Sequence, residues 1–143
     1  MGNTFRYSQR TRKMRTIARE AAFKLVFASR FTGELDSGLE NTLKKTDHLD
    51  KDDTEYIDRL LKIISEHEDE LLKIIDEHST YFPESRLFPA DKSILLVALA
   101  EIKYMDDIPA AVSANEAANI SSKYSSAKSA SFINGILSDV IKE

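Results

Sequence analysis

Apolar residues recur every three or four positions along most of the chain, which is the spacing of amphipathic helices. The first such segment runs from about 12 to 30. A break with two glycines follows at 32–38, and leucines at 35, 39 and 43 predict a short second helix. No alternating pattern typical of strands extends beyond a few residues, so the chain is predicted to be all-α. One face of the first helix collects Ile17, Ala18, Ala21, Ala22, Leu25 and Ala28.

The rest of the chain continues the helical pattern with two interruptions. The charged stretch SEHEDE at 65–70 predicts either two consecutive helices or one bent helix over 52–78. Two prolines within 79–92 mark a boundary between halves. Beyond them, Ser113 and Glu116 have the spacing of a capping box, which predicts a helix start. The pattern gives about seven helices in two small bundles that share one core.

We therefore expect a single domain over residues 1–143. A flexible basic arm at 1–11 would precede an N-terminal bundle at about 12–80 and a C-terminal bundle at about 84–143.

Charge is distributed unevenly along this chain. Residues 1–30 carry a net charge of +7 and residues 31–143 a net charge of −11. A basic segment on an acidic body suits local binding of a polyanion, although a solvated tail would have the same composition. No apolar run approaches a bilayer span, and no signal peptide is recognisable, so we expect a cytoplasmic protein.

Catalytic motifs are missing from the sequence. The chain has no cysteine, and its four scattered glycines build neither a Walker loop nor a dinucleotide-binding motif. The histidines are His48, His67 and His78, and the last two are too far apart along a helix to bind one metal ion. We expect no enzyme activity, no metal and no cofactor.

The segment SASFINGIL at 129–137 contains Asn134-Gly135, a common hairpin signal. Its flanks do not alternate, and on a helix an apolar stripe would face inward: Ile133, Ile136, Leu137, Val140 and Ile141. The opposite side then gathers a cation, a hydroxyl, an aromatic ring and a bare backbone, namely Lys128, Ser131, Phe132 and Gly135. This combination suits single-stranded RNA, because a ring stacks on a base. Alternatively, Phe132 packs against a neighbouring helix and Gly135 permits that contact.

The first helix has a similar second face, with basic residues between aromatic ones: Arg12, Thr16, Arg19, Phe23, Phe27 and Arg30. Such a face is typical of single-strand binding. Alternatively, the helix is central and buried on two sides. We expect Phe23 to lie in the core, whereas spacing leaves the position of Phe27 open.

Several motifs in order resemble the transcription antitermination factor NusB family. They are an aspartate opening an ILxxAxxEI helix, then DDIP, NEA, KYS and SASFINGIL, with the first helix resembling ARExAxxxLF. The resemblance covers roughly 12–30 and 84–141. It implies two orthogonal three-helix bundles around the first helix.

The resemblance also implies binding of single-stranded boxA RNA in ribosomal RNA operon leaders. The implied partners are the ribosomal protein NusE and the RNA polymerase antitermination complex. Carried over by position, the RNA-binding residues are the basic residues Arg12, Lys13, Arg15 and Arg19, with Phe27 and Phe132. Spacing on the last helix adds Lys128, Ser131 and Gly135 to the expected RNA-binding residues. The partner-binding position is Asp91, with Leu87 and Leu95 nearby.

This sequence departs from the family at Ala127 and Lys128, where many relatives carry an acidic pair. A lysine there should favour RNA. Two alternatives remain: an accessory RNA-binding module related to those of ribosomal-RNA cytosine methyltransferases, and a helical interaction protein that homodimerises through its first helix. The sequence leaves open whether the chain is a monomer or a homodimer.

Overall fold

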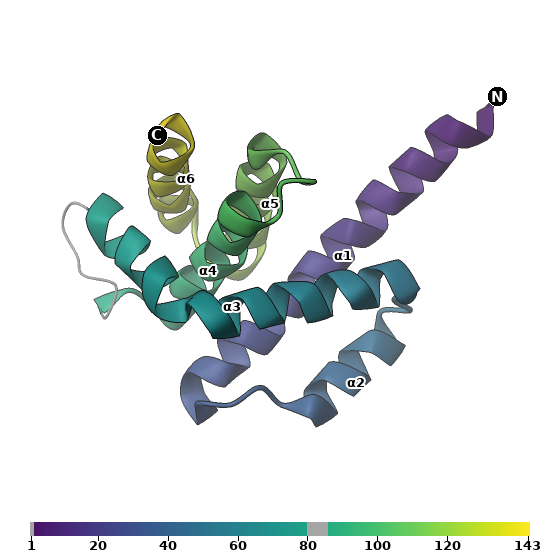
Figure 1. Cartoon of the computed structure of the whole chain (residues 1–143), viewed down its shortest axis with the longest axis horizontal. Helices are drawn as coiled ribbons and strands as arrows, with labels where there is room; N and C mark the ends of the chain where they lie inside the picture. The colour runs from purple at the N-terminus through teal and green to yellow at the C-terminus, as the bar shows by residue number, and fades with distance from the viewer. Residues whose placement is uncertain (1, 80–85) are drawn as a thin grey trace. The chain divides into compact units, whose positions relative to one another are not determined.

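The computed structural model describes residues 2–79 and 86–143, with side chains from Arg15 onward in the first segment. These residues form helices and no strands (Figure 1), so the prediction of an all-α protein is confirmed. The helices are α1 (Gly2–Thr32), α2 (Ser37–Thr46), α3 (Lys51–His78), α4 (Pro89–Tyr104), α5 (Ala110–Tyr124) and α6 (Ala127–Lys142).

The chain divides into two compact units, one ending at Arg59 and the other spanning Leu60–Glu143. The division falls inside α3, whereas the sequence placed it near residues 80–84, which lie outside the described residues. Each unit is described by itself.

In the first unit, α1 begins at Gly2, so the helical backbone extends through the segment expected to be a flexible arm. The helix ends where the sequence predicted a break. Gly33 has φ +82° and donates its N–H to the carbonyl of Ser29 at 2.8 Å. Glycine adopts this left-handed conformation without a steric penalty and satisfies a terminal carbonyl of the helix. Phe23 is buried, as expected.

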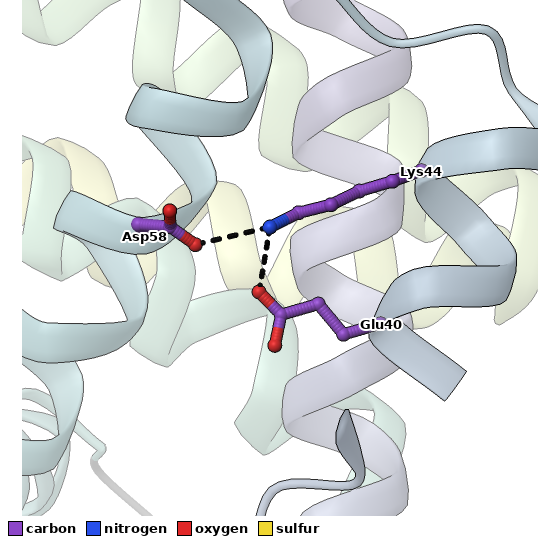
Figure 2. A network of polar contacts seen from close by, with 3 residues as sticks. All are labelled: Glu40, Lys44 and Asp58. Carbon is purple, nitrogen blue, oxygen red and sulfur yellow. Dashed lines mark hydrogen bonds and ion pairs between the residues drawn. The ribbon is translucent and has the colours of Figure 1, made fainter. Parts of the chain in front are cut away.

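Electrostatic contacts join α2 to the first part of α3 (Figure 2). Nζ of Lys44 lies 2.9 Å from Oε1 of Glu40 on its own helix and 3.2 Å from Oδ1 of Asp58 on α3. Partial burial lowers the pKa of Lys44, but hydrogen bonds and charge attraction to the two carboxylates outweigh it and raise this pKa overall. Since no side chain of α2 is fully buried, this contact is a specific connection between α2 and α3.

In the second unit, α3 bends at His67, whose φ of −122° and ψ of 18° are not helical. The predicted interruption at 65–70 is therefore a kink in one helix. The His67 ring stacks on Tyr104 at the end of α4, with ring centroids 4.1 Å apart. The Tyr104 hydroxyl donates to Glu70, one turn beyond the kink.

The helices α4, α5 and α6 pack against one another. The start of α5 differs from the prediction, because the helix begins at Ala110 and Ser113 lies inside it. The Ser113 hydroxyl donates instead to the buried Glu101 of α4 at 3.0 Å. On α6 the inward stripe is confirmed except at its end, where Ile141 is 40% exposed.

Candidate nucleic-acid interface

The segment SASFINGIL lies within α6, not in a hairpin. Ser126 caps the helix and accepts the N–H of Ser129 at 3.1 Å. Such a cap satisfies an N–H that has no partner inside the helix. Ile133, Ile136, Leu137 and Val140 are buried, so the opposite face is fixed toward solvent. We call the residues on that face the α6 outer face, and they are Lys128, Ser131, Phe132 and Gly135.

The exposure of the α6 outer face bears on whether this face is open to RNA or packs against a neighbouring helix. Lys128, Ser131 and Gly135 are exposed, and Phe132 is half-buried. A Cβ atom added to Gly135 would meet nothing within 4 Å. Among the described residues, therefore, no atom of another helix packs closely against Gly135. The space beside the glycine is free for a ligand.

Phe132 also lines a pocket of about 370 Å³ at the starts of α4 and α6. The residues around it come from the end of the α3–α4 connection and from the two helix starts: Arg86, Leu87, Phe88, Asp91, Ser126, Lys128, Ser129 and Phe132. Two exposed cations and two aromatic rings thus share one pocket. Phe88, which is 73% exposed, and Arg86 were not predicted. Only their position beside Pro89 in RLFP could have indicated them.

Asp91 lies within this pocket but offers little surface, because it is only 4% exposed. Its Oδ1 accepts the hydroxyl of Ser125 at 2.9 Å, and its Oδ2 accepts that of Ser129 at 3.0 Å. Leu95 is completely buried, which corrects the expectation that it contacts a partner directly. Leu87 is half-buried and remains accessible. The serine partners of Asp91 were missed, although they lie in the KYSSAKS segment.

On α1, the predicted RNA-binding residues divide into different environments. Arg15 lies over the ring of Tyr56, with its guanidinium carbon 4.8 Å from the ring centroid, and is half-buried. Arg19 approaches the same ring at 5.7 Å but is only 4% exposed. Arg19 is therefore placed to hold α1 against α3, and it exposes little surface for the expected contact with RNA. The side chains of Arg12 and Lys13 lie outside the described residues.

Phe27 is half-buried between two other aromatic residues of α1. Its ring is stacked on the buried Phe23, with centroids 5.9 Å apart, and meets Phe31 edge-on at 5.2 Å. Phe31 is exposed. The three rings, one turn apart, lead from the core to the surface, so Phe27 has a face that a ligand can reach.

Two kinds of feature are missing from the described residues. No group of three or more His, Asp or Glu side chains there is arranged to hold a metal ion. None of the helices in that part of the chain combines the length and the apolar character needed to cross a membrane.

The NusB family model matches residues 16–142. The chain belongs to the NusB family. A curated relative, the transcription antitermination protein NusB of Clostridium botulinum (strain Loch Maree / Type A3), is 35% identical, and the match covers 87% of this chain and 96% of the relative. The family resemblance noted in the sequence is thereby confirmed. The chain is a member of a family of transcription antitermination factors.

Solved structures of NusB have the same fold. NusB of T. maritima matches with a TM-score of 0.80 at 30% identity, covering 90% of this chain and 91% of that one. A chain in the complex of antitermination factors NusB and NusE with double-stranded RNA matches with a TM-score of 0.81 at 24% identity, covering 91% of this chain and 97% of that one. The second likeness, at this identity, shows the fold alone.

Proposed function

We propose that this NusB-family chain is a binding protein, not an enzyme, that recognises boxA-like single-stranded RNA of ribosomal RNA operon leaders in the cytoplasm. NusE would bind with it, and the pair would join the RNA polymerase antitermination complex. The family to which the chain belongs motivates this choice of partners, since a solved complex joins NusB and NusE with double-stranded RNA.

The α6 outer face is the observation that carries the proposal. Lys128 and Ser131 are exposed beside Phe132, and the backbone at Gly135 is open to solvent. Stacking on an aromatic ring and attraction of phosphates to cations are the two main sources of affinity for single-stranded RNA. Half-burial of Phe132 also suits stacking, because a ring held in place loses little conformational freedom when a base binds.

The first unit contributes the positive charge. Residues 1–30 carry +7, and Arg15 and the ring of Phe27 are both partly accessible. Arg12 and Lys13 are included as RNA contacts because of their positions in the sequence. We propose that α1 and the α6 outer face both contribute contacts to the bound RNA, while the acidic remainder of the chain repels it elsewhere.

The partner surface rests on the start of α4. Leu87 and Phe88 are accessible there and apolar, as protein interfaces favour. Asp91 lines the same pocket but is buried, so we propose that it acts on NusE through its neighbours. The methyltransferase-type RNA-binding module would also use the α6 outer face, but it would not need NusE.

The experiment that tests this function is a filter-binding titration of the full chain with boxA-like RNA. It is run with and without NusE, and with an RNA of the same composition in scrambled order. The proposal predicts tighter binding to the boxA-like RNA and a further gain when NusE is present. Equal affinity for the scrambled RNA would reject boxA recognition. Specific binding that NusE does not change would favour the methyltransferase-type RNA-binding module. A homodimer in light scattering that binds no RNA would favour the homodimerising helical interaction protein.

A further inference from the structure

Asp91 opens α4 but is connected to the beginning of α6. Both of its carboxylate oxygens accept serine hydroxyls, one from Ser125 at the end of α5 and one from Ser129 in the first turn of α6. The residue is 4% exposed. A group that is buried and has both oxygens occupied inside its own chain has little left to offer another molecule.

The hydrogen bonds continue into the cap of α6. Ser129 donates its hydroxyl to Asp91 and receives the hydroxyl of Ser126 at 3.2 Å, while Ser126 accepts the N–H of Ser129. Each hydroxyl therefore donates one hydrogen bond, and the directions are consistent throughout. The carboxylate of Asp91 is the final acceptor of the network. Its loss would leave Ser129 without an acceptor and weaken the arrangement that begins α6.

The first turn of α6 is also where the outer face begins. Lys128 precedes Ser129 directly, and Phe132 lies about one helical turn after Lys128. All three residues line the pocket that Asp91 lines. A shift or fraying of this turn would move the cation and the ring together.

We propose that Asp91 is a positioning residue that fixes the first turn of α6 through Ser129 and so presents Lys128 and Phe132 to RNA. This inference rests on the proposed function and assigns Asp91 a role different from a direct partner contact. It also couples NusE binding to RNA binding. A protein bound over Leu87 and Phe88 would stabilise the pocket in which Asp91 holds the start of α6. Coupling of this kind tightens binding of both ligands reciprocally.

The test uses variants of the full chain. Asp91→Asn keeps the shape of the side chain and one acceptor oxygen. It removes the negative charge and replaces the other acceptor oxygen with an NH2 donor. Ser129→Ala removes the donor from α6, and Ser129→Thr keeps a hydroxyl. The matched control is Glu101→Gln, because Glu101 is the other buried acid of α4 and also accepts a serine hydroxyl, from Ser113 of α5 rather than from α6.

Four quantities are measured for each variant: the melting temperature, hydrogen exchange of the backbone amides at 129–133, affinity for boxA-like RNA without NusE, and affinity for NusE. Asp91→Asn and Ser129→Ala should speed exchange at these amides and weaken RNA binding about fivefold or more. Ser129→Thr should restore both properties. Glu101→Gln should lower the melting temperature while leaving exchange at 129–133 and RNA affinity near those of the wild type.

Three outcomes would overturn the inference. In the first, Asp91→Asn weakens NusE binding but leaves exchange and RNA affinity unchanged, which makes Asp91 a direct contact. In the second, Glu101→Gln weakens RNA binding as much as Asp91→Asn does, which makes the effect one of general stability. In the third, exchange at 129–133 is unaffected by every variant. Should the wild type bind no RNA at all, the proposed function fails, while the exchange data still decide whether Asp91 fixes α6.

Discussion

Asp91 and Phe132 line the same pocket, although one opens α4 and the other lies on the outer face of α6. The sequence assigned them to different partners, the acid to a protein and the ring to RNA. Their shared pocket and the serines that connect Asp91 to α6 show that the two assignments concern neighbouring parts of one structure. Variants at either position should therefore be tested against both ligands.

Replacing Gly135 separates folding stability from RNA binding. The glycine lies inside α6, and an added Cβ meets nothing within 4 Å. Gly135→Ala should therefore raise the free energy of unfolding by about 0.5–1 kcal/mol, because alanine favours helix more strongly than glycine. If RNA approaches the bare backbone, the same variant should bind RNA more weakly. Chemical denaturation and an RNA titration measure the two effects. A stabilised variant with unchanged affinity would show that no close approach occurs at Gly135.

The contact of Lys44 with Glu40 and Asp58 should contribute modestly to stability. Lys44→Gln should lower the free energy of unfolding by about 0.5 kcal/mol, since partly exposed ion pairs are screened by water and salt. The loss should shrink in 1 M salt, where the Debye length falls to about 3 Å. Urea denaturation at low and high salt measures it. Lys45→Gln serves as the control, because Lys45 is the exposed neighbour on the same helix. An equal loss in both variants would mean that Lys44 acts through helix propensity alone.

His78 should make stability depend on pH. Its Nδ1 lies 2.8 Å from the carbonyl oxygen of Ile74, and its Nε2 lies 2.6 Å from Oε1 of Glu143. The hydrogen bond to Ile74 raises the pKa of His78 above its ordinary value of 6.5, burial opposes this, and Glu143 adds to the rise. The protonated form is thus favoured in the folded state, and its contribution is fully present below pH 6.5 and lost as pH rises through the raised pKa.

The free energy of unfolding of wild type and His78→Gln, measured between pH 5.5 and 8.5, tests this expectation. The wild type should be the more stable at the acidic end, by about 0.5–1 kcal/mol, and the difference should decrease toward the alkaline end. Glu143→Gln should remove part of the same difference. A gap that widens as pH rises would contradict the raised pKa.

The sequence predicted the helices well where apolar spacing was regular. The stripe on α6 and the interruption of α3 both appear in the structure, because burial of one helix face depends directly on that spacing. The predicted start of α5 was wrong. Ser113 and Glu116 match a local capping motif, but the Ser113 hydroxyl bonds to Glu101 of α4 instead. Local sequence spacing does not reveal such contacts between helices.

The site was predicted less completely for the same reason. Spacing correctly placed Lys128, Ser131 and Gly135 on an exposed face of α6. It could not show that Arg19 is buried beside Tyr56 or that Asp91 is held by serines from two other segments. These environments depend on tertiary packing. Phe88 and Arg86 were missed because they join the pocket only through the turn into α4.

Salt-dependent RNA binding of Phe132→Ala, beside Lys128→Gln and the wild type, tests the central claim most directly. Stacking depends little on salt and is worth about 1–3 kcal/mol per base, so Phe132→Ala should bind roughly tenfold more weakly at every salt concentration with an unchanged slope. Lys128→Gln should instead flatten the slope of log affinity against log salt by about 0.7, the value for one phosphate contact on a single strand. Thermal melting of each variant provides the control for folding. A Phe132→Ala protein that melts like the wild type and binds RNA equally well, or one so destabilised that its weaker binding follows from unfolding, would contradict an RNA-stacking role for the α6 outer face.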